Sequence, residues 1–390
     1  MLLMNSLQLD TTYRTNSFLQ HEGNLCIEDP KKASTLQAAW YRDESIYAIE
    51  RAGIFRHFWQ YIGPSGLTKE AGSFLTTAID GLQLVVVRGH DGVLRGFHNI
   101  CRHRGGPIAK PPQDGHSLHF GKTKLLTCQY HGWSYALDGN LAAASHMQEA
   151  EDFAPKDCRL PQVAVKEWYG FIFVNLDLAA APFTDHVAGI AETVERDMKF
   201  TERFFKRFEY DVDANWKIYC DNYLEGYHVP FLHPELTDVL EFQKYTTTVF
   251  DHYSLQSSPI EGADNAYSTA GPVHYYFVTP NIMLNILPGR IQVNSVIPIS
   301  VNKTRVIFDY YFDDTSNLKK IGKDIEFSEL VQAQDADMCA YIQKSMESGS
   351  YESGRIAPQQ EVAVHHFQNF VRSTIKKFSE KITSVKANSL

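Results

Sequence analysis

Hydrophobic and polar residues follow a strand-like pattern in the first half of the chain. Residues 84–87 (LVVV) form a short apolar run, and the turn at residues 89–92 (GHDG) separates this run from a second one. Two apolar runs joined by a glycine turn predict a β-hairpin within residues 82–100. Short runs separated by glycine and proline continue to about residue 165. We therefore predict a small all-β domain over residues 55–165.

The rest of the chain mixes the periods of strands and helices. Three predicted strands are followed by two predicted helices: residues 208–217, 292–300 and 304–312, then residues 324–348 and 360–378. Strands followed by terminal helices are typical of an α+β domain, in which helices cover an antiparallel sheet. We predict such a domain over residues 166–390, with residues 1–54 packing against it. The fold class is then α+β, with the small all-β domain inserted in the larger one.

Composition and charge argue against several classes of function. The 390 residues are 44% hydrophobic and 21% charged, which is typical of a globular protein. Because 37 basic residues stand against 46 acidic ones, the net charge is −9, and we expect neither nucleic-acid nor anionic-membrane binding. No apolar stretch approaches the roughly 18–20 residues of a membrane-spanning helix, and the N-terminus lacks the pattern of a signal peptide. We expect a cytoplasmic protein.

Two pairs of cysteine and histidine lie in glycine-rich segments. They are Cys101 with His103 and Cys128 with His131. Two thiolates and two imidazoles can hold a tetrahedral zinc ion, or a [2Fe–2S] cluster with two cysteines on one iron and two histidines on the other. A zinc finger usually has both cysteines before both histidines, whereas each segment here contributes one of each. This order favours a two-iron cluster between two loops, with zinc as the alternative.

A second group of metal-binding residue types lies between residues 215 and 235. His228 and His233 are five positions apart, off a regular helical face, and Pro230 between them permits a break through which both imidazoles could converge. Two histidines and one carboxylate form the facial triad of nonheme Fe(II) oxygenases. Taken alone, a pair of core histidines explains the spacing equally well.

Both groups resemble the motifs of one enzyme family. CRHRGGP (residues 101–107) and CQYHGWSY (residues 128–135) resemble the Rieske motif pair, including the Trp133 that follows the second loop in oxygenases. NWKIYCDNYLEGYHVPFLHPE (residues 215–235) resembles the mononuclear iron motif of Rieske oxygenase α subunits. The resemblance begins near residue 38 and extends to the C-terminal helices. Over nearly its whole length the chain therefore resembles a Rieske nonheme iron oxygenase.

The resemblance implies the ligands of two iron centres. The ligands of the [2Fe–2S] cluster would be Cys101, His103, Cys128 and His131. The mononuclear Fe(II) would be held by His228, His233 and an aspartate on a helix far downstream. The segment QAQDAD (residues 332–337) matches that helix, and within it Asp335 aligns with the family's ligand in preference to Asp337.

The resemblance also implies an electron-transfer bridge. Glu225 precedes His228 by three residues, so one helical turn stacks the two side chains. In the family an acid at this place, usually Asp, connects the iron ligand to a Rieske histidine of the neighbouring subunit. Glu225 is therefore the predicted bridge, with Asp221 as the second candidate, and Asn222 is the motif asparagine that we count as a further catalytic candidate. A glutamate here resembles the choline, carnitine and glycine-betaine monooxygenases.

One departure from the family lies between the two Rieske motifs. The 24 residues between His103 and Cys128 are more than the family usually has. The excess falls in residues 111–124, which we predict to be an enlarged surface loop with His116 and His119 in solvent. Such a loop leaves the ligands intact and alters the face where an electron donor would dock.

The function implied is that of a terminal oxygenase, using O2 and electrons from a separate NAD(P)H-dependent reductase or ferredoxin. A separate donor is needed because the chain has neither GxGxxG nor a P-loop. The substrate implied is a small quaternary ammonium or N-methyl compound, hydroxylated at a C–H bond with C–N cleavage to follow where the carbon bears nitrogen. The resemblance also implies a homotrimer. Six aromatic residues are candidate walls for a methylated ammonium ion: Tyr223, Tyr227, Phe231, Tyr275, Tyr276 and Phe277.

Two other classes of function stay open on sequence alone. A ring-hydroxylating dioxygenase acting on an aromatic acid or hydrocarbon would share every metal ligand. A pure electron carrier would need only the first cluster and about a hundred residues, so the long remainder of the chain argues against it.

Overall fold

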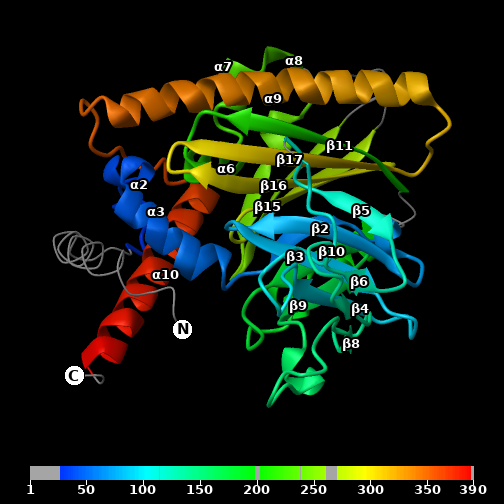
Figure 1. Ribbon diagram of the computed structural model, residues 1–390. Helices are drawn as coiled ribbons and strands as arrows, with labels where there is room; N and C mark the ends of the chain where they lie inside the picture. Colours follow the sequence, from blue (N-terminus) through cyan, green and yellow to red (C-terminus); the bar gives the residue numbers. More distant parts are fainter. Residues whose placement is uncertain (1–26, 114, 198–202, 238, 261–269, 388–390) are drawn as a thin grey trace. The chain divides into compact units, whose positions relative to one another are not determined.

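The structure is a computed structural model, which describes residues 27–113, 115–197, 203–237, 239–260 and 270–387 (Figure 1). The chain folds into two compact units. Residues 55–185 form the smaller unit, and the described residues of 1–54 and 186–390 form the larger one. The predicted boundary at residue 165 lies too early, because it cuts through a strand that pairs on both sides within the smaller unit.

The smaller unit contains two antiparallel sheets, with the strand orders β1-β10-β9-β4-β3-β2-β5 and β6-β7-β8. The strands are β1 (Gln60–Pro64), β2 (Ser73–Ile79), β3 (Leu82–Arg88), β4 (Leu94–His98), β5 (His119–Lys122), β6 (Leu126–Thr127), β7 (Ser134–Tyr135), β8 (Leu141–Ala143), β9 (Gln162–Trp168) and β10 (Phe171–Asn175). Short 3-10 helices occupy Ser65–Thr68 and Pro155–Cys158. Val85 and Val87 join one apolar cluster while Leu84 and Val86 join another. The continuous apolar run of β3 thus arises because both faces of the strand are buried.

The predicted hairpin is confirmed, and the predicted surface loop is only partly correct. Strands β3 and β4 pair in antiparallel fashion, and the Gly89 N–H donates to Val93 O at 2.9 Å across the turn. Within residues 111–124, however, the chain forms β5, which pairs with β2 at the edge of the sheet. The backbone of β2 offers an open edge to any segment that reaches it, and local sequence does not reveal this. His116 is exposed, while His119 lies in β5 and is half-buried.

The larger unit is built on a second seven-stranded antiparallel sheet with the order β11-β17-β16-β15-β14-β13-β12. Its strands are β11 (Arg203–Val212), β12 (Thr246–Val249), β13 (Tyr253–Ile260), β14 (Gly271–Val278), β15 (Ile282–Leu287), β16 (Arg290–Ser300) and β17 (Lys303–Phe312). Its helices are α2 (Ala39–Arg42), α3 (Glu44–Glu50), α5 (Ile190–Asp197), α6 (Trp216–Tyr223), α7 (Val229–Leu232), α8 (Pro234–Thr237), α9 (Leu318–Glu347) and α10 (Val362–Ala387). A π-helical turn covers Arg51–Phe55, a 3-10 turn covers Phe242–Lys244, and α4 (Phe183–His186) lies where the two units meet in sequence.

The long C-terminal helices confirm the predicted α+β architecture. Helix α9 lies beside β11 (Figure 1), contacts α6, and reaches β17 and β16 through Ser328. The predicted strand over residues 208–217 is wrong at its end, because β11 stops at Val212. The side chain of Asn215 accepts from the Lys217 N–H at 3.0 Å and so caps α6. This N-cap starts a helix where the apolar residues alone had predicted that the strand continues. No helix among the described residues combines the length and the apolar character needed to cross a membrane.

The described N-terminal residues pack on the larger unit. Leu36 N donates to Gln368 Oε1 of α10 at 2.8 Å. On α3, Glu50 forms an ion pair of 2.6 Å with Lys217 of α6, and both side chains are fully buried. The Trp216 indole donates to the other carboxylate oxygen of Glu50 at 2.8 Å. These contacts hold the start of α6, the helix that leads into the candidate site.

Candidate metal centres and active-site cavity

The two Cys/His loops of the smaller unit share one backbone conformation. Cys101 N donates to Gly106 O at 2.7 Å, and Cys128 N donates to Trp133 O at 2.9 Å, which closes each loop five residues on. The cysteine carbonyl accepts from the glycine N–H four residues on in both loops, at 3.0 Å and 2.9 Å. Both of these glycines have left-handed φ angles, +75° and +76°, a conformation that favours glycine. The glycines in the two motifs are therefore required by the loop shape.

The four candidate cluster ligands gather at the tips of these loops. The rings of His103 and His131 lie 4.7 Å apart between centroids, and His103 stacks on Trp133 at 4.8 Å. Cys101 and Cys128 are buried in the apolar cluster below. Desolvation, followed by the charges of His103 and Arg104, lowers the pKa of His131, which favours the neutral imidazole that binds metal. Two buried cysteines and two neighbouring imidazoles fit the donor set of a [2Fe–2S] cluster.

The loops also leave space and hydrogen-bond donors for such a cluster. A Cβ on Gly106 would approach Cys128 Sγ to 2.9 Å, so a side chain there would collide with the thiolate. The Tyr135 hydroxyl lies 3.3 Å from Cys101 Sγ and accepts from the Arg102 N–H at 2.9 Å. A hydrogen-bond donor at a cysteine sulfur is one of the means by which a protein sets a cluster's reduction potential.

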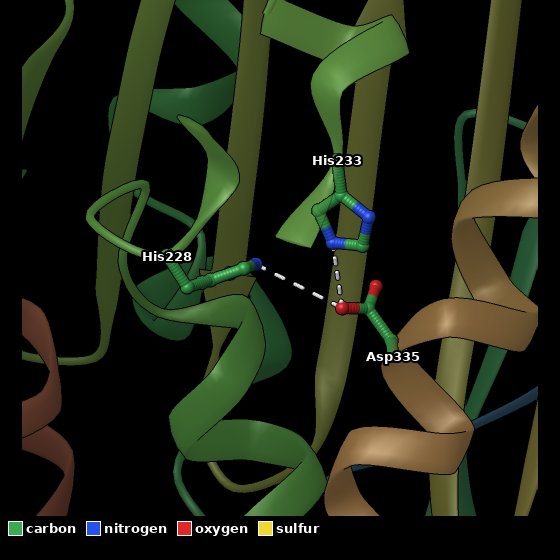
Figure 2. Close-up of side chains that lie close together, drawn as sticks. All are labelled: His228, His233 and Asp335. Carbon is green, nitrogen blue, oxygen red and sulfur yellow. Dashed lines mark hydrogen bonds and ion pairs between the residues drawn. The ribbon is translucent and has the colours of Figure 1, made fainter. Parts of the chain in front are cut away.

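In the larger unit, His228, His233 and Asp335 converge on one point, as Figure 2 shows. One ligand atom from each of them lies within 4.8 Å of the others. His233 Nε2 is 2.9 Å from Asp335 Oδ1, and His228 Nε2 is 3.8 Å from the same oxygen. Two imidazole nitrogens and a carboxylate oxygen at such distances fit the donor set of a nonheme Fe(II) site.

The five-residue spacing of the histidines has a simple structural cause. His228 and His233 flank α7, a single helical turn, so that one imidazole precedes the turn and the other ends it. Pro230 lies in the first turn of α7, where a missing N–H is tolerated, so it starts this turn and does not break a longer helix. Asp335 comes from the middle of α9. The predicted convergence of the two imidazoles is thus observed, by way of the short helix.

The other ring nitrogen of each histidine is held by an acceptor. Glu225 Oε1 lies 2.6 Å from His228 Nδ1, and Gln334 Oε1 lies 2.6 Å from His233 Nδ1. Acceptors at both Nδ1 atoms place the protons there and leave both Nε2 lone pairs for a metal ion. Burial lowers the pKa of His233, but the hydrogen bond and charge of Asp335 outweigh burial and raise it. The contacts at the two Nδ1 atoms therefore orient both imidazoles toward the point where the three side chains converge.

The structure separates the predicted bridge from its competitor. Glu225 contacts His228, whereas Asp221 accepts from the Tyr41 hydroxyl at 2.7 Å and from Gln368 at 3.1 Å. Asn222 donates to Asp335 Oδ1 at 3.1 Å and so orients the carboxylate. Desolvation raises the pKa of Asp221 to about 7, although its hydrogen bonds and Lys217 oppose this.

Downstream on α9, Asp337 is exposed and lies outside the triad. Gln334, next to the predicted ligand Asp335, contacts His233 but was not predicted from the sequence. The only sequence feature that could have indicated this contact is the position of Gln334 directly before the predicted ligand.

A cavity of about 130 Å³ lies beside the triad. His228, His233 and Asp335 line it together with aromatic rings and amide side chains. The aromatic members are Tyr219, Tyr223, Tyr245, Tyr275 and Phe308, and the amides are Asn222, Asn285, Asn294, Gln256, Gln292 and Gln332. Of the six predicted wall residues, only Tyr223 and Tyr275 line this cavity, since Tyr276 and Phe277 are buried elsewhere. The row of amides was not predicted.

A second hollow of about 580 Å³ opens on the other side of the predicted bridge. Tyr227 and Phe231 line this hollow and are 54% and 81% exposed. The sequence predicted them as walls of the active-site cavity, which they do not line. Glu225, Asn222 and His228 line both this hollow and the cavity. Glu225 therefore borders both the cavity beside the triad and the second, outer hollow.

Comparisons with known proteins agree with this geometry. The family model described as "Rieske [2Fe-2S] domain" matches residues 58–163, and the one described as "Ring hydroxylating alpha subunit (catalytic domain)" matches residues 201–377. The first match decides for an iron–sulfur cluster over zinc at the paired loops.

Three relatives illustrate the similarity. The chain is 31% identical over 369 residues to the chloroplastic choline monooxygenase of Arabidopsis thaliana, covering 89% of this chain and 85% of that protein. It is 30% identical over 376 residues to the carnitine monooxygenase oxygenase subunit of Escherichia coli (strain K12), covering 90% of this chain and 96% of that one. The crystal structure of the quaternary ammonium Rieske monooxygenase CntA with L-carnitine covers 88% of this chain and 96% of its own, with a TM-score of 0.77 at 26% identity.

Proposed function

The chain belongs to the Rieske nonheme iron oxygenase α subunits, the family that includes the choline and carnitine monooxygenases, and we propose that its substrate is a small quaternary ammonium compound. The observation that carries this proposal is the cavity beside the triad, whose walls combine aromatic rings with neutral amides. Aromatic faces attract a methylated ammonium ion, which has no N–H to give to an acceptor. The similarity to choline and carnitine monooxygenases supports the same substrate class.

We assign the metal ligands as the sequence predicts. His228, His233 and Asp335 hold the mononuclear iron, and Cys101, His103, Cys128 and His131 hold the [2Fe–2S] cluster. When bound, the iron and the cluster supply O2 activation and electron storage. One oxygen atom enters a C–H bond and the other leaves as water, with two electrons and two protons consumed.

The chain's own residues orient this chemistry. Glu225 and Gln334 keep the protons of His228 and His233 on Nδ1, and Asn222 fixes one oxygen of Asp335. The cavity walls position the substrate and limit water around it. If the hydroxylated carbon bears the nitrogen, the resulting hemiaminal loses its proton from oxygen and breaks the C–N bond.

We further propose that electrons arrive through Glu225 from a neighbouring subunit of a homotrimer. The hollow outside Glu225 and the exposed Tyr227 and Phe231 support a contact at this place. A structure of a quaternary ammonium Rieske monooxygenase is described as revealing inter-subunit electron transfer. The first donor would be an NAD(P)H-dependent reductase or a ferredoxin.

We also propose a cytoplasmic location. In the described part of the chain Cys158, Cys220 and Cys339, which the cluster does not use, form no disulfide, and a reducing compartment keeps such thiols reduced.

The alternative, an aromatic ring-hydroxylating dioxygenase, fits the cavity less well. A flat hydrocarbon offers no acceptor to the amide nitrogens of Asn294 and Gln332, which line the cavity. One experiment distinguishes the two functions. Holoenzyme and a reductase are incubated with a panel of choline, L-carnitine, glycine betaine, benzoate and naphthalene. Oxidation of a quaternary ammonium compound supports the proposal, and dihydroxylation of an aromatic compound with no reaction of the other three contradicts it.

A further inference from the structure

A chain of directed hydrogen bonds runs along the sheet wall of the active-site cavity. Arg290, Gln292 and Asn294 occupy alternate positions of β16, so their side chains lie on one face of the sheet. All three line the cavity, and they are only 4%, 2% and 3% exposed. Three buried polar side chains in a row require a specific arrangement of donors and acceptors.

The arrangement is fixed by a group that can only donate. A guanidinium has no acceptor, so the Nη2 of Arg290 must donate to the Oε1 of Gln292. The Ser328 hydroxyl donates to the same oxygen at 3.3 Å, and itself accepts from the Tyr310 hydroxyl at 2.9 Å. The amide of Gln292 therefore cannot turn around. Its nitrogen must face Asn294, where it donates to Oδ1 at 2.8 Å.

The amide of Asn294 is oriented in turn. The Oδ1 of Asn294 accepts from Gln292, so the Nδ2 faces away from that contact. This Nδ2 has no hydrogen-bond partner within the described residues. Across the cavity on α9, the buried Nε2 of Gln332 also has no partner in that part of the chain, while its Oε1 accepts from Tyr219. Buried N–H groups without acceptors are unfavourable. The cavity thus presents donors that a bound molecule has to satisfy.

The wall carries no net charge at this point. Arg290 forms an ion pair of 2.8 Å with Asp324 of α9, and both side chains are 5% exposed. The guanidinium polarises the chain of amides without placing a free cation in the cavity. A neutral, polarised N–H suits an oxygen acceptor, which is either a carboxylate or a hydroxyl.

We propose that Asn294 Nδ2 donates a hydrogen bond to an oxygen atom on the end of the substrate remote from the reacting carbon, and that Gln292 is its positioning residue. This rests on the proposed function, and it narrows the substrate to quaternary ammonium compounds that carry oxygen. An oxygen-free cation such as tetramethylammonium can occupy the aromatic part of the cavity but leaves the Asn294 donor unmatched.

The test compares three probes in reconstituted holoenzyme: L-carnitine with a carboxylate, choline with a hydroxyl, and tetramethylammonium without oxygen. Asn294→Leu removes the donor and should raise the KM of L-carnitine and choline about 10- to 100-fold, with less than about a 3-fold change for tetramethylammonium. Asn294→Asp keeps the acceptor for Gln292 but presents an oxygen to the cavity. It should raise the KM of L-carnitine by the same factor, and that of choline much less, because a hydroxyl can donate. The two variants therefore tell a carboxylate partner from a hydroxyl partner.

A variant of the positioning residue Gln292 distinguishes the proposed hydrogen-bond role from a folding defect. Gln292→Glu still accepts from Arg290 and Ser328 but has no N–H for Asn294, whose amide then turns its oxygen to the cavity. It should reproduce the probe pattern of Asn294→Asp with residue 294 unchanged, while a merely structural role would lower kcat for all three probes equally. Metal content and the iron–sulfur spectrum serve as the folding control.

The outcomes separate this inference from the proposed function. Equal factors for the three probes in all variants overturn the role of Asn294 and leave the proposed function intact. Absence of calorimetric binding of all three probes to the wild-type holoenzyme overturns both.

Discussion

Glu225 holds His228 at two points. Its Oε1 lies 2.6 Å from the ring Nδ1, and its Oε2 accepts from the backbone N–H of His228 at 3.0 Å. The carboxylate thereby fixes both the tautomer and the position of His228, a predicted iron ligand. Because Glu225 also lines the outer hollow, the same residue contacts His228 and borders the hollow where we propose that electrons arrive.

Replacing Glu225 should interrupt electron delivery without emptying either metal centre. Glu225→Ala is expected to keep the iron content and the iron–sulfur spectrum and to lower substrate-coupled O2 consumption by at least 10- to 100-fold, the usual effect of losing such a partner. Glu361→Gln is the matched control, since Glu361 lines the same hollow and has no contact with His228. Substrate-coupled O2 consumption that persists in Glu225→Ala would contradict the bridge.

Removing an iron ligand should affect one centre only. His228→Ala is expected to lose mononuclear iron, measured by metal analysis, while the visible spectrum of the [2Fe–2S] cluster stays, because the two sets of ligands lie in separate compact units. Asp337→Ala serves as the control and should retain both, since Asp337 is exposed and outside the triad. Simultaneous loss of the cluster spectrum in His228→Ala would contradict the division of ligands.

The sequence was sufficient to predict two metal centres because most of the predicted ligands are close together in the chain. Cys101 and His103 lie in one loop, and His228 and His233 flank one helical turn, so short segments contain most of the chemistry. Asp335, more than a hundred residues downstream, was found only through the family resemblance. The α+β architecture likewise followed from periodicity in long elements such as β17 and α9.

What the sequence did not reveal depends on long-range contacts. Gln334 holds His233, and Asn294 is oriented by Arg290 and Ser328, yet none of these pairings has a local pattern. Strand β5 forms because β2 offers it an edge. The sequence alone does not give the hydrogen-bond partners of an isolated glutamine or asparagine, because these partners come from elements far away in the chain.

Asp221 should make the stability of the protein depend on pH. Desolvation raises its pKa from 3.8 to about 7, so the folded protein binds this proton more tightly than the unfolded chain does. The stabilisation is complete below pH 3.8 and is lost as the pH rises to about 7, with a magnitude on the order of 4 kcal/mol. The groups around the carboxyl are Tyr41, Gln368, Lys217 and Glu361.

The neutral analogue isolates this contribution. Asp221→Asn should flatten the fall in the free energy of unfolding between pH 5 and pH 8, as followed by denaturant titration at each pH. If wild type and variant lose stability in parallel over this range, another group is responsible.

The buried pair of Glu50 and Lys217 should be far more sensitive to truncation than an exposed pair. Glu50→Ala leaves the Lys217 ammonium buried without its carboxylate and should lower the free energy of unfolding by about 3–5 kcal/mol. Lys32→Ala breaks the exposed ion pair of Lys32 and Asp29, whose side chains are 80% and 45% accessible. It should change the free energy of unfolding by less than about 1 kcal/mol. Comparable losses in the two variants, measured by denaturant unfolding, would show that the buried pair does not anchor α6.

We propose that iron held by His228, His233 and Asp335 would supply the chemistry that inserts oxygen into a quaternary ammonium compound bound in the cavity beside them. A single-turnover experiment tests it without any reductase: chemically reduced holoenzyme is mixed with ¹⁸O2 and either choline, L-carnitine or benzoate, and the products are identified by mass spectrometry. We expect up to one product per iron site from a quaternary ammonium compound, and this product either carries ¹⁸O or is formed by loss of an ¹⁸O-labelled carbonyl fragment. A labelled diol from benzoate, with choline and L-carnitine recovered unchanged, would contradict it.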